Sequence, residues 1–356
     1  MKLVSTTLTG CNADLIGDAL RSVVDWVDAC IVIDTGADEA TLEVAQKVAG
    51  SKLHVCSFAW VHDFAAARNF AFDAALSVKA DWCITVDTDE RILPNGDDIP
   101  KMLAACPAIG VMMRHESNSY MKERCFRLPP EERWRGPTHE CVYLRTREIL
   151  PRARFAEVPK TPEGYRAKFE RDVAILKRHT KDHPKDPRWF YYLGDALQNL
   201  QQYAAAIDAY TRCAALRGWN EESAWACYRA AECYCILELW QSAIDACADG
   251  LARHPGIAEL AWLAAYAAWK GGWSDQAVQW AHMSIALGHF AGLSATGVTP
   301  PRIGFKNVGA LWEGPYDVLR YAYRALGETQ RADEAESLYQ QATLARHAAH
   351  ARDVVP

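Results

Sequence analysis

Three carboxylates follow an apolar run in the stretch DWCITVDTDE, residues 81–90. Asp87 and Asp89 are two residues apart, and on an extended strand side chains at that spacing point the same way, so both could approach one cation. Oxygen ligands suit Mg²⁺ or Mn²⁺ better than zinc, and these ions usually bind phosphate oxygens as well. The spacing therefore predicts a divalent metal that carries a diphosphate. On the alternative interpretation, Asp87 to Glu90 are only turn and cap residues after a strand.

The stretch WVHDFAAARNFAFDAAL, residues 60–76, predicts a helix with Asp63 as its N-cap. Arg68 and Asn69 interrupt the apolar face of this helix. An arginine near a helix start, beside a metal-diphosphate site, could contact phosphate directly. The alternative is a structural ion pair between Arg68 and either Asp73 or Asp87.

Two further stretches supply polar side chains. Asp34 follows the apolar run CIVI and could accept a hydrogen bond from a base or a ribose, or it could be an ordinary turn residue. In RWRGPTHEC, residues 133–141, His139 could be a third metal ligand or a general base. A lone histidine is more often structural, so a functional role for His139 is supported only together with the other site residues.

Strands and helices alternate from residue 1 to about residue 120. We expect strands at 2–8, 29–36, 52–60, 82–89 and 110–117, and helices at 12–27, 41–49 and 64–78. Continuous apolar strands between amphipathic helices predict a largely parallel sheet that is covered on both faces. Ligands bind beyond the carboxyl ends of the strands in such sheets, where Asp34 and Asp87 would lie.

Residues 188–348 have the pattern of helical repeats. Ala206, Ala243 and Ala277 occupy similar positions at intervals of 37 and 34 residues, and a further copy centres on Ala335. A helix-turn-helix period near 34, with small residues where helices cross, is typical of tetratricopeptide repeats. The alternative is a generic helical bundle. Residues 288–314 are rich in Gly and Pro and are expected to be an insertion before the last copy.

The composition is that of a globular protein with a net charge of −6. Residues 114–188 hold 19 Lys and Arg against 12 Asp and Glu, which indicates either an anionic ligand there or a solvated basic face. The sequence has no signal-peptide pattern and no apolar run long enough for a membrane span. The twelve scattered cysteines then favour reduced thiols in a cytoplasmic protein.

Taken together, these stretches resemble a family 2 glycosyltransferase of the GT-A fold with C-terminal tetratricopeptide repeats. The resemblance is carried by VIDTG, DFAAARN, DWCITVDTDE and W-x-G-x-x-HE, then a basic helix and FYYLGDAL, and it runs from about residue 2 to 340. Bacteriocin S-glycosyltransferases are similar, as are bacterial and phage transferases with such repeats. The resemblance implies an α/β GT-A domain at 1–160 with a Rossmann-like, mostly parallel sheet, a linking basic helix at 161–187, and all-α repeats at 188–348.

The resemblance also implies a chemistry, namely inverting transfer of a sugar from a nucleotide-diphosphate donor with Mn²⁺ or Mg²⁺ as cofactor. A UDP-sugar is the first choice of donor. The implied donor-binding residues are Thr6, Leu8, Asp34, Arg68, Asn69, Asp87, Thr88 and Asp89. The implied metal ligands are Asp87, Asp89 and His139. Glu140, Glu90 and Glu116 compete for the role of the base that takes the acceptor's proton.

Two functions stay open at this point. The first is an active transferase whose repeats position the acceptor or form a homodimer. The second is a degenerate transferase that serves as a repeat-based protein-interaction scaffold. For the active enzyme we rank a peptide or protein acceptor slightly ahead of hydroxymethylated phage DNA or a cell-surface glycan. The joint presence of Asp87, Asp89, Arg68 and His139 favours catalysis.

Overall fold

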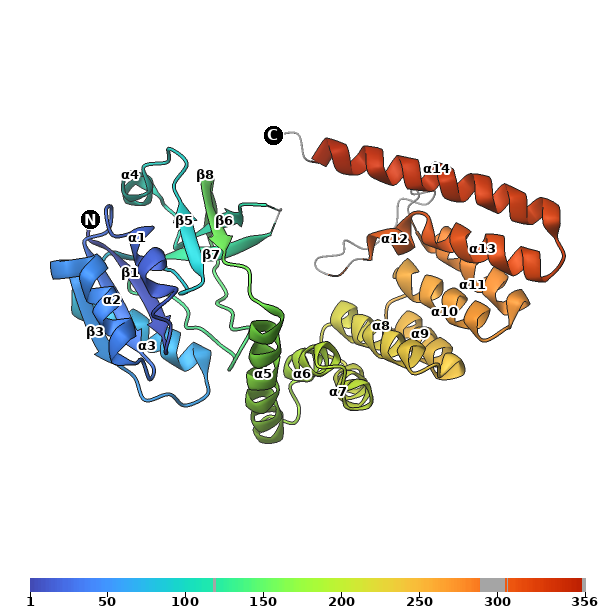
Figure 1. The fold of residues 1–356 in the computed structure, drawn as a ribbon, viewed down its shortest axis with the longest axis horizontal. Helices are drawn as coiled ribbons and strands as arrows, with labels where there is room; N and C mark the ends of the chain where they lie inside the picture. Colours follow the sequence, from blue (N-terminus) through green and yellow to red (C-terminus); the bar gives the residue numbers. More distant parts are fainter. Residues whose placement is uncertain (118–119, 289–304, 306, 354–356) are drawn as a thin grey trace. The chain divides into compact units, whose positions relative to one another are not determined.

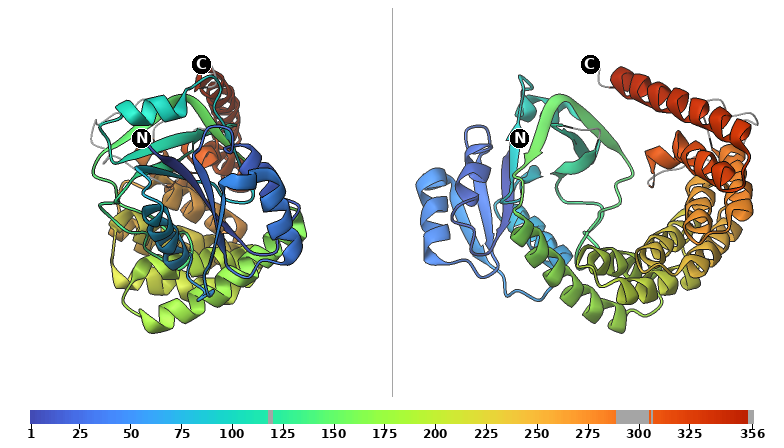
Figure 2. Two further views of the ribbon diagram at one scale, coloured as in Figure 1. Left: turned by 90° about the vertical axis from the view of Figure 1, so that its left-hand side faces the viewer. Right: turned by 45° about the vertical axis from the view of Figure 1, so that its right-hand side comes forward.

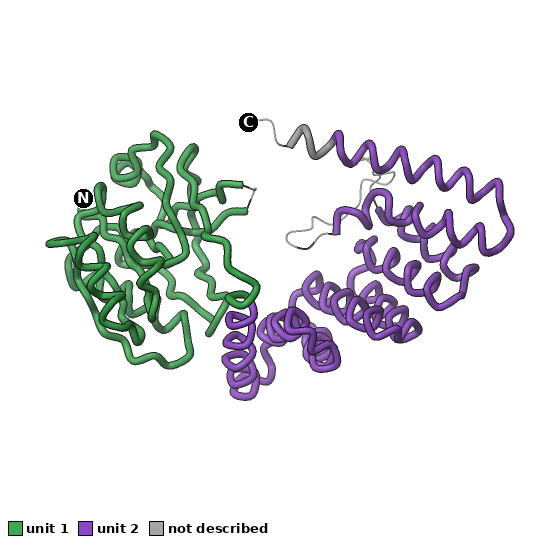
Figure 3. The backbone as a smooth tube through the Cα atoms, viewed as in Figure 1, with its two compact units in different colours: residues 1–165 green, residues 166–356 purple. Residues whose placement is uncertain are grey.

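The structure, a computed structural model, describes residues 1–117, 120–288, 305 and 307–353 (Figure 1). It divides into two compact units, Met1–Tyr165 and Arg166–Pro356 (Figure 3). Helix α5 (Pro162–Asp182) crosses the division and covers most of the stretch predicted as the linking helix.

The first unit is built on one eight-stranded sheet in the order β3-β2-β1-β4-β7-β6-β8-β5. The strands are β1 (Leu3–Thr9), β2 (Ala29–Asp34), β3 (Leu53–Ser57), β4 (Trp82–Thr85), β5 (Glu90–Leu93), β6 (Gly110–His115), β7 (Met121–Arg127) and β8 (Arg147–Glu157). β1 to β4 form a parallel block, as the alternation of strands and helices predicts. β7 is antiparallel to both β4 and β6, and β8 is parallel to β6 but antiparallel to β5. The sheet is therefore mixed, and its parallel block presents the carboxyl ends of β1, β2 and β4 at one edge.

Helices cover both faces of this sheet. They are α1 (Ile16–Arg21), α2 (Glu39–Ala49), α3 (Phe64–Ser77) and α4 (Ile99–Ala105). Side chains of α1, α2 and α4 share one buried cluster with Leu3 and Ile84 of the sheet. Side chains of α3 share a second cluster with Ile31 and Phe126. Strands buried on both faces have continuous apolar sequences, which is why β2 and β4 could be recognised.

Several elements are shorter than their sequence predicts, with β3 for example covering only Leu53–Ser57 of the expected 52–60, and α1 and β4 differ most clearly. α1 covers only Ile16–Arg21 of the expected 12–27. Beyond it, tighter bonds such as the one from the Val23 N–H to the Leu20 carbonyl (3.1 Å) are mixed with helical ones such as the one from the Val24 N–H to the same carbonyl (2.9 Å). The predicted strand at 82–89 ends at Thr85. After it the chain turns, and the Glu90 N–H donates to the Asp87 carbonyl (2.9 Å) as β5 begins.

The second unit consists of helices that pack in succession (Figure 2). Beyond α5 they are α6 (Pro187–Asn199), α7 (Tyr203–Leu216), α8 (Asn220–Ile236), α9 (Trp240–Arg253), α10 (Ala258–Lys270), α11 (Ser274–Leu287), α12 (Val308–Leu311), α13 (Gly314–Ala325) and α14 (Thr329–Asp353). Ala206, Ala243, Ala277 and Ala335 are all buried where paired helices meet. The predicted helical repeats are thus confirmed. Of the predicted insertion at 288–314, residues 289–304 and 306 lie outside the described part of the chain.

Gly194 on α6 shows why the helix pairs need small residues. A Cβ placed there would come within 2.6 Å of the Tyr210 ring on α7, closer than real Cβ atoms approach. Tyr210 is fully buried, so its ring has little room to move. Leu193-Gly194 and Tyr210 are part of the repeat pattern in the sequence, and the close helix packing is its physical reason.

Within the described residues, no helix is both long and apolar enough to cross a bilayer. All twelve cysteines are free thiols in the structure, and most of them are buried. Burial raises the pKa of several thiols, for example that of Cys125 to about 12.

Candidate functional site

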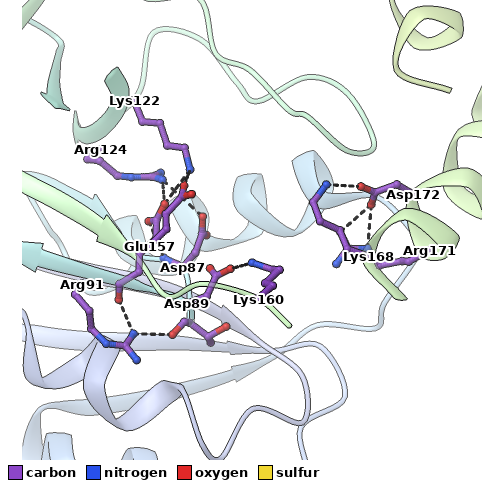
Figure 4. Close-up of polar contacts among 12 residues, drawn as sticks. Asp87, Asp89, Arg91, Lys122, Arg124, Glu157, Lys160, Lys168, Arg171 and Asp172 are labelled. Carbon is purple, nitrogen blue, oxygen red and sulfur yellow. Dashed lines mark hydrogen bonds and ion pairs between the residues drawn. The ribbon is translucent and has the colours of Figure 1, made fainter. Parts of the chain in front are cut away.

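Asp87 and Asp89 lie in the turn between β4 and β5, not on a strand (Figure 4). The argument that strand geometry directs both carboxylates to one cation is therefore wrong. Each carboxylate instead has its own cationic partners from distant parts of the chain. Asp87 pairs with Arg68 and Arg124, and Asp89 pairs with Lys160. The positive charge that the sequence calls for is supplied, in this structure, by side chains.

Arg68 is the centre of the first group of contacts. Its Nη2 donates to Asp87 Oδ1 (2.8 Å), its Nε donates to Glu140 Oε1, and its guanidinium lies 5.2 Å from the centre of the Trp134 ring. The side chain is 10% exposed. It is held there by α3, which begins as predicted, with Asp63 Oδ1 accepting from the Ala66 N–H (2.9 Å). Of the two pairings weighed from sequence, Asp87 is the partner, whereas Asp73 pairs with Arg133.

Asn69 fixes the segment that delivers Glu140. Its Nδ2 donates to the Trp134 carbonyl (3.0 Å), and its Oδ1 accepts from the Trp134 N–H (2.9 Å). The chain then doubles back, with Gly136 at φ 99° and His139 at φ 49°, and Arg135 bridges to Cys141. Left-handed backbone at these two positions makes the turn possible. The side chain of Asn69, predicted to lie beside the donor, is thus occupied with positioning this loop.

A second group of charges surrounds Glu90, the first residue of β5. Its Oε1 accepts from Lys122 Nζ (3.0 Å) and from Arg124 Nη2, and its Oε2 accepts from the Asp87 N–H (3.3 Å). Lys122 also pairs with Glu157 at the end of β8. The Glu90 side chain is only 1% exposed. Four elements of the chain therefore converge on the turn that holds Asp87.

The pKa values of Asp87 and Glu90 are shifted in opposite directions. Burial alone would raise the pKa of Asp87, but the charges of Arg68 and Arg124 outweigh it and hold this pKa below its usual 3.8. For Glu90 burial dominates, and with the nearby Asp87 it raises the pKa above 4.5 even though Arg124 and Lys122 oppose the shift. Asp87 is therefore a permanent anion, while Glu90 has the environment of a carboxyl group that holds its proton more tightly.

Asp89 is tied to the end of the first unit by two contacts. Its carbonyl accepts from the Val158 N–H (2.7 Å), and its carboxylate accepts from Lys160 Nζ. The side chains of Asp89 and Lys160 are 26% and 34% exposed, respectively. This ion pair is thus more accessible than the one between Arg68 and Asp87.

The remaining predicted residues occupy varied positions. Thr6 is buried on β1, where its hydroxyl lies 3.4 Å from that of Thr85, and Leu8 is half-buried. Thr88 offers its carbonyl to Arg91 (2.8 Å). Asp34 Oδ1 accepts from the N–H groups of Gly36 (2.9 Å) and Ala37 (2.7 Å), which is the turn role weighed as its alternative. Glu116 is exposed just beyond β6.

The described residues contain no group of three His, Cys, Asp or Glu side chains placed to hold one metal ion. His139 is half-buried and is not brought together with Asp87 and Asp89 in such a group. The complete three-ligand set expected from the sequence is therefore not formed by these side chains. Two carboxylates still fit Mg²⁺ or Mn²⁺, because such ions complete their shell with water and phosphate oxygens.

The sequence reasoning missed Lys122, Arg124 and Lys160 as members of the site. One signal was available, since Lys122 and Arg124 stand two apart on a β-like run and so share one face of β7. The sequence has an excess of basic residues after residue 114, but nothing in it shows that β7 lies beside β4.

Comparison with known proteins decides what kind of domain carries this site. Residues 8–139 match the family model "Glycosyl transferase family 2". The first unit contains a family 2 glycosyltransferase domain. The matched residues include the end of β2, the Arg68 helix, the Asp87 turn and the Trp134–His139 loop, where the stretches that carry the resemblance lie.

Curated relatives match about half of the chain. A TPR repeat-containing protein of Synechococcus elongatus is 32% identical over 207 residues, 52% of this chain and 50% of the relative. The SPbeta prophage-derived glycosyltransferase SunS of Bacillus subtilis is 23% identical over 209 residues, 54% of this chain and 48% of SunS. The chain therefore spans about half the length of these relatives. Among solved structures, the crystal structure of MamA is similar, with 19% identity, a TM-score of 0.39, and coverage of 55% of this chain and 98% of MamA.

Proposed function

We propose that the chain transfers a sugar from a nucleotide-diphosphate donor, with UDP-sugars as the first choice, and that Mn²⁺ or Mg²⁺ assists. The observation that carries the proposal is the turn after β4. It places Asp87 and Asp89 at the carboxyl edge of the parallel block, with Arg68, Arg124 and Lys160 beside them. A sugar nucleotide requires carboxylates that can bind a metal ion and cationic side chains that can bind phosphate oxygens.

The donor set supports a metal at the two aspartates. The two carboxylates are about equally exposed, at 26% and 27%, but Asp89 is the better placed ligand because its cation partner is a single flexible lysine. Asp87 is held by two arginines, and its low pKa keeps it ionised at any working pH. A metal bound here would stabilise negative charge on the leaving diphosphate. His139 would be at most an additional contact to the diphosphate.

Unused hydrogen-bond donors support an anionic ligand at the same place. Within the described part of the chain, Arg68 Nη1 and Arg124 Nε are buried and lack a hydrogen-bond partner. Buried donors are normally paired, and an unpaired one costs about 1–3 kcal/mol. An oxygen of a bound donor would satisfy Arg68, whose side chain is 10% exposed, whereas Arg124 is as enclosed as Glu90 and contributes its charge to Asp87 from within. Arg68 would then bind the donor while it orients Asp87 and Glu140.

Among the three candidate bases the geometry favours Glu140. Glu90 is enclosed and bonded to Lys122 and Arg124, so no acceptor reaches its carboxylate. Glu140 is 13% exposed and is oriented by Arg68 within the cluster. A base positioned in this way contributes roughly 10²–10⁴-fold to the rate. Glu116, which is exposed, is the second candidate. In direct displacement the base takes the acceptor's proton as the acceptor attacks the anomeric carbon, which inverts its configuration.

The acceptor we propose is a peptide or protein, presented by the repeats of the second unit. Hydroxymethylated DNA and a cell-surface glycan are the alternative acceptors, and a homodimer through the repeats is the alternative role of the second unit. A salt titration of acceptor binding distinguishes DNA from a peptide or protein acceptor, because binding to a phosphate backbone weakens steeply with salt.

The deciding experiment measures nucleotide and metal binding before activity. Calorimetry with UDP and Mn²⁺ should give binding that Asp89→Ala abolishes. Asp25→Ala, which removes an exposed carboxylate in the turn after α1, is the matched control and should bind as the wild type does. A panel of nucleotide sugars then identifies the donor through Mn²⁺-dependent hydrolysis. If neither UDP nor any nucleotide sugar binds to folded protein, the degenerate scaffold is the better description.

A further inference from the structure

Turns of the same geometry join the helices within the pairs α6–α7, α8–α9, α10–α11 and α13–α14. The middle residue of each turn has a positive φ, at Gln201 (60°), Glu238 (57°), Gly272 (84°) and Gly327 (77°). The N–H of the residue that follows donates to the carbonyl five positions earlier, at 2.9 Å in every case. Because successive helices pack against one another, equivalent turn residues follow one another along the array.

The two middle turns carry exposed apolar side chains. We call this group the turn edge, and its members, each between 38% and 52% exposed, are Ile236, Leu237, Leu239 and Trp273. Large apolar side chains are commonly exposed one at a time, whereas a group of them on consecutive elements marks an interaction surface.

The outer turns show that the apolar residues are not needed for the turn itself. The position held by Leu239 and Trp273 is taken by Gln202 in the α6–α7 turn and by Glu328 in the α13–α14 turn. All four residues make the same backbone hydrogen bond. The turn edge is therefore an apolar centre between polar ends, as in the core and rim of a protein–protein interface.

The backbone of the two middle turns is already satisfied. The Glu238 N–H donates to the Cys235 carbonyl (3.1 Å), and the Gly272 N–H donates to the Trp269 carbonyl (3.0 Å). The N–H groups of Leu239 and Trp273 are used as well. An extended peptide that adds to an edge depends on main-chain hydrogen bonds. The turn edge offers side chains instead, so it suits the surface of a folded partner.

Two charged side chains indicate which folded partner fits. Glu238 in the first of these turns and Lys270 just before the second are exposed, and neither forms an ion pair within the described residues. Lys270 Nζ lies 5.4 Å from the centre of the Trp269 ring. Asp275, the other acid nearby, lies in the first turn of α11, where the helix dipole favours it. A two-fold axis between the turns would bring Glu238 of one copy to Lys270 of the other, and would do so twice.

We propose that the turn edge is the contact surface of a two-fold symmetric dimer of this chain. The α8–α9 turn of one copy then packs against the α10–α11 turn of the other, and Trp273 covers Leu237 and Leu239 across the axis. Aromatic side chains at the centre of an interface commonly supply much of its binding energy. The dimer uses the turns and leaves the helix faces of the repeats to an acceptor. It does not rest on sugar transfer, since no residue of the first unit takes part.

Sedimentation velocity of the full chain, from about 1 to 100 µM, should show a monomer–dimer equilibrium. Leu239→Gln and Trp273→Gln should each raise the dimer dissociation constant at least about tenfold, because each substitution is present twice in a symmetric interface. Gln202 shows that the turn accommodates glutamine at this position. Leu344→Gln is the matched control, since Leu344 is 72% exposed on α14, outside the turn edge, and should leave the equilibrium unchanged.

Two charge variants test the symmetry, and they keep the proposal testable if a glutamine variant fails to fold. Glu238→Lys and Lys270→Glu should each weaken self-association at low salt, because like charges then face each other. An equal mixture of the two should form a mixed dimer, in which both contacts pair opposite charges again. Native mass spectrometry distinguishes the mixed dimer from the two homodimers by mass.

Three results would overturn the proposal. The first is a wild-type chain that stays monomeric throughout the concentration range. The second is a dimer that both folded glutamine variants leave intact, which would put the contact elsewhere. The third is a mixture of the charge variants that associates no better than either alone. No nucleotide enters these measurements, so each result leaves the proposed transferase function untouched.

Discussion

Two ion-paired aspartates, the half-buried Asp87 in the first unit and the buried Asp172 in the second, are satisfied in opposite ways (Figure 4). Asp172 pairs with Lys168 (3.0 Å) and Arg171 (2.7 Å), both on its own helix α5. Asp87 draws its cations from α3 and β7, which lie 19 and 37 residues away in the sequence. The first pairing holds within a single helix. The second exists only when three elements of the fold are in place, so it couples the charge of the site to the tertiary structure.

The difference also shows in how exposed the cations are. Lys168 and Arg171 are 29% and 45% exposed, so water can take over from either of them. Arg68 and Arg124 are almost completely buried, and water cannot replace them at Asp87. Removing one partner of a buried pair leaves an uncompensated charge, which costs far more than losing an exposed pair. The comparison therefore predicts a hierarchy of effects.

The largest effect is expected for Arg68→Met. This change removes the buried cation from between Asp87 and Glu140, and it should lower the free energy of unfolding by about 3 kcal/mol. Urea unfolding of the purified chain measures it. Arg133→Met is the matched control, because Arg133 pairs with Asp73 of the same helix but both side chains are about half exposed. Equal losses in the two variants would contradict the distinction between buried and exposed pairs.

The Arg68 cluster also shows how far the sequence could lead. The N-cap at Asp63 and the repeat alanines are local signals, and both can be predicted from the sequence spacing. The partners of Asp87 were not, because β7 reaches β4 through a pairing that no local pattern encodes. Arg68 was singled out for breaking an apolar face, whereas Arg124 lies on a strand where an alternating charge is unremarkable. The predicted strand at 82–89 is too long, because the sequence does not distinguish a strand that continues through Asp89 from a turn that follows the apolar run.

Lys160→Met is expected to produce an effect of about tenfold, or ~1.4 kcal/mol, on metal binding. In the absence of donor, Lys160 competes with a divalent ion for Asp89, so removing its charge should tighten Mn²⁺ binding. Binding of UDP without metal should weaken at the same time, because a phosphate loses a nearby cation. Electron paramagnetic resonance of bound Mn²⁺ and calorimetry with UDP measure the two effects. Lys101→Met, on the exposed start of α4, is the control, and a change of the same sign in both affinities would rule out the competition.

A smaller effect, about 1 kcal/mol, is expected for Asp172→Asn. The amide keeps the shape of the side chain but loses two charge-assisted contacts, whose cations are then free to enter water. Thermal unfolding with the signal of the second unit measures this loss. Asp87→Asn should cost more when thermal unfolding is followed by the signal of the first unit, and a reversal of that order would show that the local pair is the stronger one.

The smallest expected effect is on the pH dependence of the folding stability, to which Asp87 and Glu90 should contribute with opposite signs. The folded pKa of Asp87 lies below the 3.8 of the unfolded chain, so the unfolded state takes up more protons in acid. Its contribution to stability is complete above about pH 4 and is lost as the pH falls through the folded pKa. The pKa of Glu90 is raised, so its contribution is complete below its unfolded value of 4.5 and is lost as the pH rises through the folded pKa. The test is the free energy of unfolding measured from pH 3 to pH 7. In Asp87→Asn the loss of stability towards low pH should be smaller than in the wild type. In Glu90→Gln the loss of stability towards higher pH should be absent. If both variants shift the profile in the same direction, burial governs the two carboxyl groups alike, and the arginines at Asp87 do not outweigh it.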